Sequence, residues 1–168
     1  SIKNLSNIHF ELFKAVLMRD DTLVLMVDTS MYEDEANEYL ECYNIFLRES
    51  YSLKELRDYQ EDLIMDAVKK YKRDLKNLIL IGHHPIIATK VKNGKVKKPL
   101  NDIPFFTPVL ANIYETIPDA NFYYLCADLH LYQKGMVEIE MGDGIMSIEQ
   151  HNDGTWGTKL HEEIPRTE

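Results

Sequence analysis

The pattern of apolar and polar positions begins with two short segments that predict a pair of strands. Residues 10–19 are expected to form a strand, and residues 22–27 are a nearly unbroken apolar run. A short run of that kind is typical of a strand that is buried on both faces of a sheet. Asp20 and Asp21 lie between the two segments and favour a turn. The sequence therefore predicts a hairpin that enters a buried sheet.

Two longer segments carry apolar residues at helical spacing. In residues 33–47 the apolar positions fall on one face of a helix, and acidic residues fill the first turns, where the helix dipole favours negative charge. We favour the interpretation that these acids are a solvated helix start. The alternative is a metal-binding role. Residues 52–72 continue a second helical stripe, and Ser52 with Glu55 matches an S-x-x-E capping box. Both segments are predicted to be helices.

A buried strand followed by a histidine-bearing loop comes next. Residues 78–81 are all apolar, and Gly82 stops the run before His83, His84 and Pro85. A helix, a buried strand and a loop in this order indicate an α/β fold with the loop at the carboxyl end of a strand. Ligands tend to bind at that end in open α/β sheets.

The rest of the chain predicts further short elements. Residues 90–97 are typical of a hairpin, because Asn93-Gly94 suits a type I′ turn and Val91 would face Val96. The remaining expectations are a helix at 106–114, a strand at 122–126, an antiparallel meander at 132–141, 145–150 and 156–161 with turns at 142–144 and 152–154, and a frayed tail at 162–168.

Composition narrows the class of protein. The chain has 168 residues, which favours one domain, and its formal net charge is −9 with 45% hydrophobic residues. These values exclude a collagen-like or wholly disordered chain and argue against nucleic-acid binding by bulk charge. The apolar runs are too short to span a bilayer. Two cysteines, Cys42 and Cys126, make no disulfide framework, so we expect a reducing, intracellular compartment.

Histidine and aspartate residues follow two of the predicted strands. His83 and His84 come directly after one strand, and Asp128 and His130 come after another. If the two strands are neighbours, imidazole and carboxylate groups meet at one sheet edge, as a divalent-metal site requires. The alternative is a loop whose imidazoles bond backbone groups. The second block, Asp128-Leu129-His130, favours the metal hypothesis.

The same residues resemble a known family. The segments LILIGHHPI and YYLCADLHLYQKG are similar to the last two signature blocks of the calcineurin-like metallophosphoesterases. The Tyr-Gln-Lys near the end of the second segment resembles the purple-acid-phosphatase-like branch. LVLMVDTSMY resembles the strand ending in Asp-Thr or Asp-Ser that commonly follows the family's Asn-His-Glu block. RDYQEDLIMDAV resembles the helix that commonly precedes the histidine block. The resemblance covers most of the chain in the right order.

This resemblance implies a fold and a chemistry. The fold would be α/β, part of a four-layer α/β/β/α sandwich with a C-terminal antiparallel meander, and residues 1–161 would be the carboxyl-terminal portion of one domain. Two divalent metals (Mn, Mg, Fe or Zn) would bind a phosphomonoester or phosphodiester and activate water. By motif position, His83 would be a ligand of the second metal and His130 a ligand of the first. His84 would support the loop or approach the phosphate.

Two departures from the family pattern change the expectation. Asp128 stands where the family has a metal-binding histidine, and its hard oxygen would favour Mg or Mn. The family's Asp-x-His, Gly-Asp-x-x-Asp and Gly-Asn-His-Glu blocks, which should come before these segments, are not found there. Asp128-Leu129-His130 spells Asp-x-His, but the other two blocks do not follow it, so we interpret the match as a coincidence. With only His83, Asp128 and His130, two metals could not be held, and no catalytic residue is assigned to this segment.

We therefore expect a partner that completes the site, either an amino-terminal half or a separate chain, and no useful phosphatase activity from this chain alone. A half-sandwich would also leave one apolar sheet face exposed, which implies an obligate partner. The main alternative is a degenerate, non-catalytic phosphoesterase fold that acts as a scaffold or assembly component. A third is a mononuclear metal-binding module.

A cluster of lysines marks the predicted hairpin. Lys90, Lys92, Lys95 and Lys97 lie between the two ligand loops in a chain that is otherwise acidic. They could attract an anionic phosphoester or a nucleic-acid backbone. The alternative, an ordinary solvated edge hairpin whose lysines prevent edge pairing, is slightly favoured.

Overall fold

The computed structural model describes residues 11–33, 36–88, 91–92, 95–96, 100–101, 103–127, 132–142 and 144–153. The strands of the main sheet are β1 (Phe13–Met18), β2 (Thr22–Val27), β3 (Asn77–Ile81), β8 (Asn121–Cys126), β9 (Tyr132–Met141) and β10 (Gly144–Asp153). The helices are α1 (Leu40–Leu47), α2 (Leu53–Tyr71) and α3 (Thr107–Thr116), with short 3-10 segments η1 (Ser30–Tyr32), η2 (Ala36–Tyr39) and η3 (Pro104–Phe106). Two small pairs join β4 (Ile87–Ala88) to β7 (Leu100–Asn101) and β5 (Val91–Lys92) to β6 (Lys95–Val96).

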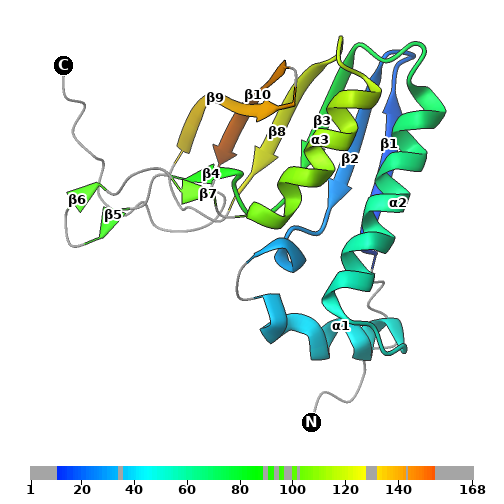
Figure 1. Ribbon diagram of the computed structural model, residues 1–168, viewed down its shortest axis with the longest axis vertical. Coiled ribbons are helices and arrows are strands. Elements are labelled where there is room, and N and C mark those ends of the chain that lie inside the picture. The colour runs from blue at the N-terminus through cyan, green and yellow to red at the C-terminus, as the bar shows by residue number, and fades with distance from the viewer. Residues whose placement is uncertain are drawn as a thin grey trace.

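One mixed six-stranded sheet forms the centre of the fold, in the order β1-β2-β3-β8-β10-β9 (Figure 1). Strands β2, β3, β8 and β10 run parallel to one another, and β1 and β9 pair antiparallel at the two edges. The predicted α/β class and the amino-terminal hairpin are confirmed. The condition set for the metal hypothesis, that the two strands before the histidine and aspartate residues are neighbours, is met, because Ile81 of β3 pairs with Leu125 of β8 in a parallel register.

The carboxyl-terminal strands correct part of the prediction. β9 and β10 pair antiparallel as expected, and β10 also pairs parallel with β8, so the two strands complete the main sheet, which the sequence did not predict. The predicted turn at 152–154 is wrong for its first two residues. Asn152 and Asp153 continue the strand, since they pair with Gln133 and Tyr132. The expected strand at 156–161 and the tail at 162–168 lie outside the described residues.

The helical predictions hold for α2 and α3 and only in part for the first helix. Ser52 Oγ accepts a hydrogen bond from the Glu55 N–H and the Glu55 carboxylate accepts one from the Ser52 N–H, so the capping box is confirmed. The segment at 33–47 is helical only from Leu40, after a 3-10 turn at 36–39. Glu33 is extended, with ψ near 163°, and its carboxylate reaches the sheet edge instead of starting a helix.

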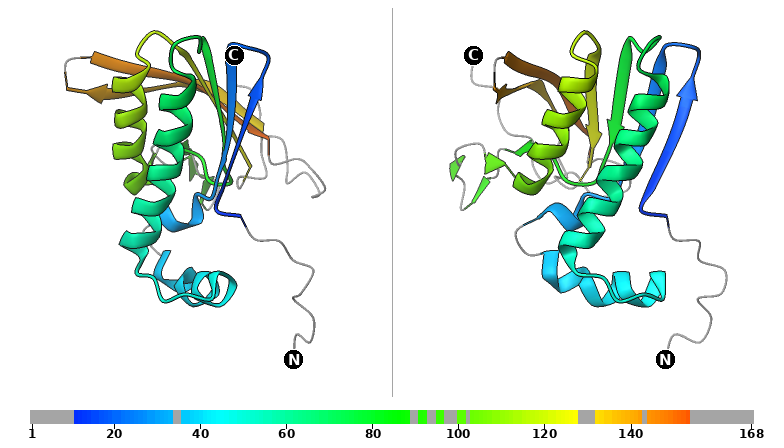
Figure 2. Two further views of the ribbon diagram at one scale, coloured as in Figure 1. Left: turned by 90° about the vertical axis from the view of Figure 1, so that its right-hand side faces the viewer. Right: turned by 45° about the vertical axis from the view of Figure 1, so that its right-hand side comes forward.

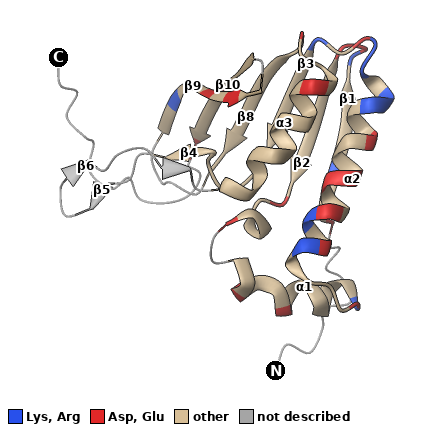
Figure 3. Ribbon diagram, viewed as in Figure 1, with Lys and Arg blue, Asp and Glu red and all other residues tan. Residues whose placement is uncertain are grey.

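The hydrophobic core lies between the sheet and helices α2 and α3, which cover the same face (Figure 2). Alternate residues of the central strands point into it, as the period of two in a strand requires. Leu23 on β2, Leu78 on β3 and Phe122 on β8 share one row of the register and are all buried. The outward side of α2 is charged along its length, with both signs interspersed (Figure 3). This amphipathic helix therefore matches its sequence pattern.

No described helix or strand covers the opposite face of the sheet (Figure 2), and apolar side chains on that face are exposed. Met26, Leu125 and Val16 are 44%, 39% and 38% exposed, and Tyr123 is half-buried. We call the surface formed by these four residues, Met26, Leu125, Val16 and Tyr123, the open face. One sheet with helices on a single side accounts for two layers of the four-layer sandwich that the sequence resemblance implies. The other two layers are not seen among the described residues.

No helix in the described part of the chain is both long and apolar enough to cross a membrane.

Candidate functional site

The candidate site lies at the edge of the sheet where the parallel strands β2, β3 and β8 end. Thr29 follows β2, the histidine loop (residues 82–87) follows β3, and Ala127 follows β8. The last two segments are joined directly, because the Ala127 N–H donates a hydrogen bond to the His83 carbonyl at 3.0 Å. The two sequence blocks singled out for metal chemistry therefore begin side by side. Asp128 and His130 themselves lie outside the described residues.

Thr29 connects the end of β2 to the histidine loop at this edge of the sheet. Its side chain is 1% exposed, and its Oγ1 accepts hydrogen bonds from the backbone N–H groups of His83 and His84, at 3.1 and 3.0 Å. The same oxygen lies 3.0 Å from His84 Nδ1. A threonine hydroxyl has two acceptor lone pairs and one proton, so the proton is directed at Nδ1. This assignment, made from the hydrogen-bond network, puts the ring proton of neutral His84 on Nε2.

Glu33 meets the other nitrogen of the same ring. Its Oε1 atom lies 2.8 Å from His84 Nε2, and the two side chains are 12% and 25% exposed for histidine and glutamate. The two atoms lie close together, but they do not have the alignment of a hydrogen bond. Glu33 Oε1 has no hydrogen-bond partner within the described structure. We therefore treat it as an electrostatic contact. It explains why Glu33 leaves the helix that the sequence predicted.

Thr29, His84 and Glu33 resemble a hydrolase triad in composition but not in chemistry. A nucleophilic hydroxyl needs an accessible oxygen with a lone pair free to attack. Thr29 Oγ1 is buried and accepts two backbone hydrogen bonds. The set therefore orients His84 and holds the histidine loop. Both ring nitrogens of His84 are engaged, so coordination of a metal by this ring would cost one of these contacts.

Gly82 and Tyr124 fix the start of the histidine loop. A Cβ atom on Gly82 would clash with Tyr124 Oη and would lie 2.6 Å from Thr29 Cγ2, so only glycine fits. Tyr124 is fully buried, and its hydroxyl donates a hydrogen bond of 2.6 Å to the His84 carbonyl. Burial raises the pKa of Tyr124 well above the ordinary value of 10.0, which keeps this donor protonated.

Asp28, which precedes Thr29, is already bonded within the fold. One carboxylate oxygen accepts the Ser30 N–H at 3.0 Å, and the other accepts the Tyr43 hydroxyl at 2.9 Å. Burial, together with the Asp28 charge, raises the pKa of Tyr43 far above its usual value. These bonds anchor α1 and η1 to the end of β2. Asp28 thus acts as a structural carboxylate in the described part of the site.

Gln150 of β10 holds the far end of the histidine loop, and sequence reasoning missed it. Its Oε1 accepts the N–H groups of Ile86 and Ile87, at 2.8 and 3.2 Å, and its Nε2 donates to the Ile87 carbonyl at 2.7 Å. Sequence reasoning also missed the part played by Glu33. The sequence signal that could have identified Gln150 is its place in an apolar strand. The period-two pattern predicts a core residue at this position, and the sequence has an amide there.

The donor set for a metal is incomplete in the described residues. His83 is exposed at the edge, with its ring 4.7 Å from the His84 ring in an edge-to-face arrangement. No group of three or more His, Cys, Asp or Glu side chains suited to a metal occurs within the described residues. The two other expected ligands lie outside that part.

For the lysine hairpin at 90–97, the structure describes the backbone pairing of two short strands. β5 and β6 pair antiparallel, and Val91 stands opposite Val96, as predicted. Lys90 and Lys97 lie outside the described residues. The anion-attracting role of Lys90, Lys92, Lys95 and Lys97 therefore stays a prediction.

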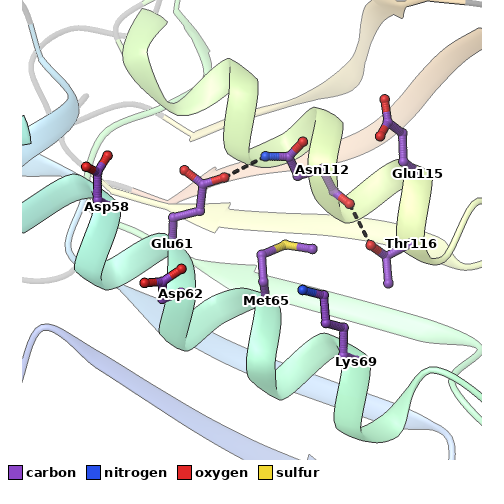
Figure 4. A pocket seen from close by; sticks show the side chains of 8 residues that line it. All are labelled: Asp58, Glu61, Asp62, Met65, Lys69, Asn112, Glu115 and Thr116. Carbon is purple, nitrogen blue, oxygen red and sulfur yellow. Dashed lines mark hydrogen bonds between the residues drawn. The ribbon is translucent and has the colours of Figure 1, made fainter.

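A second concave region lies between α2 and α3, away from the strand ends (Figure 4). It encloses about 460 Å³ and is lined by Asp58, Glu61, Asp62, Met65, Lys69, Asn112, Glu115 and Thr116. Asn112 Nδ2 donates a hydrogen bond of 2.5 Å to Glu61 Oε1 across it. This contact ties the two helices together, so the residues serve helix packing.

Comparison with models of known protein families gives no match, and comparison with curated proteins gives none either.

Proposed function

We propose that this chain contributes part of a metal-dependent phosphoesterase, which hydrolyses a phosphomonoester or a phosphodiester once the rest of its site is supplied by an amino-terminal half or a separate chain. One observation carries the proposal. The Ala127 N–H bonds the His83 carbonyl, so the histidine block and the Asp128-Leu129-His130 block leave the sheet at adjacent points. Adjacent strand ends of a parallel sheet are where α/β proteins build ligand sites.

Each residue has a distinct task in this proposal. His83 would ligate one metal through its exposed ring, with Asp128 and His130 as further ligands beyond the described residues. Bound divalent ions would hold the phosphate and lower the pKa of a bound water. His84 would support the loop, since Thr29 and Glu33 engage its two ring nitrogens. Thr29 would keep His83 at the edge through its backbone N–H.

The open face supports the requirement for a partner. Met26 on β2, Leu125 on β8 and Val16 on the edge strand β1 each expose more than a third of their surface, on the side of the sheet away from α2 and α3. Contiguous apolar surface of this kind marks an interaction site in soluble proteins. A second sheet, brought by the part that carries the missing ligands, would cover it and would bring those ligands to the same edge.

Hydrolysis assays on the protein isolated from its source test the proposal. Chromogenic phosphomonoester and phosphodiester substrates should be turned over with Mn²⁺ or Mg²⁺, and His83→Asn should lower the rate at least about a hundredfold while the fold is kept. Asp66→Asn, on the exposed side of α2, is the control and should leave the rate unchanged. The 168-residue chain alone should be inactive. Robust metal-dependent turnover by that chain alone would contradict the divided site.

A non-catalytic scaffold is the second candidate function. It is favoured by the way the polar groups at the strand ends bond one another: Thr29 with His84, His84 with Glu33, and Asp28 with Tyr43. Under this alternative the site has lost its metal, and Asp128 is a sign of that loss. The same assays discriminate, because a scaffold would show no turnover and no effect of His83→Asn with any divalent ion.

A further inference from the structure

The histidine loop has an unusual hydrogen-bond arrangement that involves Gln150. The N–H groups of His83 and His84 both donate to Thr29 Oγ1. The next residue, Pro85, has no N–H. The N–H groups of Ile86 and Ile87 both donate to Gln150 Oε1. Two side chains, one from the segment after β2 and one from β10, therefore satisfy every backbone donor from His83 to Ile87.

The Gln150 amide imitates the backbone of a neighbouring strand. It accepts from the Ile87 N–H and donates to the Ile87 carbonyl at 2.7 Å, so it pairs with both polar groups of one residue, as a strand neighbour does. Its side chain is only 6% exposed, so water cannot readily replace these bonds. Deleting a buried partner leaves the bonded groups unsatisfied, which costs more than the bond itself contributes.

The two attachments act on opposite ends of the loop. Thr29 and Tyr124 hold His83 and His84 from the side of β2 and β8. Gln150 holds the two residues that follow Pro85 from the side of β10. The direction in which the chain leaves His84 is therefore set by a strand that lies more than sixty residues further along the sequence.

We propose that Gln150 is a positioning residue for the histidine loop, which fixes the orientation of the His83 and His84 side chains by holding Ile86 and Ile87. The inference concerns the loop that carries the proposed metal ligand His83, but it needs neither a metal nor turnover. It can therefore fail while the proposed function stands, and the reverse also holds.

Asn152 provides a matched control on the same strand. It lies two residues after Gln150, its burial marks the same side of the sheet, and it is fully buried. Its amide oxygen and nitrogen have no hydrogen-bond partner within the described structure. Replacing Asn152 with leucine, which is similar in size, removes an amide that has no bond to any of the described residues. Gln150→Met removes an amide that makes three bonds.

The experiment compares Gln150→Met and Asn152→Leu in the 168-residue chain by nuclear magnetic resonance at a temperature where both are folded. In Gln150→Met, amide hydrogen exchange at Ile86 and Ile87 should speed up by roughly tenfold or more relative to Leu78 and Leu80. The ring resonances of His83 and His84 should shift as well. Asn152→Leu should leave the exchange rates and the ring resonances unchanged.

Two results would overturn the proposal. One is a folded Gln150→Met chain whose Ile86 and Ile87 amides stay as protected as in the unsubstituted chain. The other is faster exchange throughout the sheet with unchanged histidine ring resonances, which a purely structural role would give. If Gln150→Met does not fold, Gln150→Asn decides. It keeps an uncharged amide but shortens the side chain by one methylene group, which draws the amide away from Ile86 and Ile87, so the ring resonances should shift, and unchanged resonances would again refute the proposal.

Discussion

Thr29 is bonded to His84 twice, through the His84 backbone N–H at 3.0 Å and through the ring nitrogen Nδ1 at 3.0 Å. The two residues are 55 positions apart in the sequence. One hydroxyl thus ties the end of β2 to the loop after β3. The contact is partly buried, so water competes with it less than at an open surface, and it gives the His84 ring one preferred orientation.

The first prediction concerns this hydroxyl. Thr29→Val keeps the shape of the side chain but leaves the partly buried N–H groups of His83 and His84 without this acceptor, so the free energy of unfolding should fall by roughly 1–3 kcal/mol. Thr29→Ser restores the hydroxyl and should recover most of the loss. Urea unfolding followed by circular dichroism measures both. Equal stability of Thr29→Val and the unsubstituted chain would show that the hydroxyl is not an acceptor for the loop.

The second prediction uses two glycines. Gly82→Ala would push a methyl group against Tyr124 Oη and Thr29 Cγ2, so it should destabilise the chain by roughly 2 kcal/mol or more. Gly135→Ala is the control, because a Cβ atom at Gly135 meets nothing within 4 Å. Thermal unfolding should show a lower Tm for Gly82→Ala only. A similar Tm for the two variants would mean that the loop moves aside at little cost.

The third prediction concerns alkaline pH. The folded-state pKa of Tyr43 is raised far above 10.0, first by burial and then by the Asp28 charge. A raised pKa means that the neutral form is bound more tightly in the fold, so stability is complete below about pH 10 and is lost as pH rises beyond it. Tyr43→Phe removes this contribution.

Urea unfolding at several pH values between about 8 and 11 checks that sign. The unfolding free energy of Tyr43→Phe should fall less steeply with pH than that of the unsubstituted chain. Tyr59→Phe alters a tyrosine that is 49% exposed and serves as the control, so it should follow the unsubstituted curve. A Tyr43→Phe curve that also follows it would contradict the assignment of this buried hydroxyl.

The fourth prediction addresses the open face. Met26→Lys places a charge in the middle of this face, whereas Tyr59→Lys places one on α2 at a similar exposure, 44% against 49%. Both variants should fold. Only Met26→Lys should weaken association with the part that completes the proposed site, by at least about tenfold in Kd, because a buried unpaired charge is costly. Analytical ultracentrifugation measures it, and equal association of both variants would exclude the open face as the interface.

The local elements of this fold could be predicted because their signals are local. The Ser52-Glu55 capping box and the Asp20-Asp21 turn each lie within a few residues, and both elements form as expected. The neighbourhood of β3 and β8 was a conditional expectation, and the parallel pairing of Ile81 with Leu125 meets the condition.

The site partners could not be predicted because they come from distant segments. Gln150 reaches Ile86 across 64 positions, and nothing in the local pattern says which backbone groups a buried amide will bond. Glu33 was assigned to a helix from its neighbours, yet the tertiary contact with His84 draws it to the sheet edge. β10 was expected in an antiparallel meander, and its additional parallel pairing with β8 depends on packing of the whole sheet.

Native mass spectrometry of the protein isolated from its source tests the central claim most directly. The proposed function predicts a species heavier than this chain, with the missing amino-terminal part in the same or a second polypeptide, and with two divalent metal ions bound. A chain that is isolated alone and without metal, or a metal-free assembly, would contradict it and would favour the scaffold.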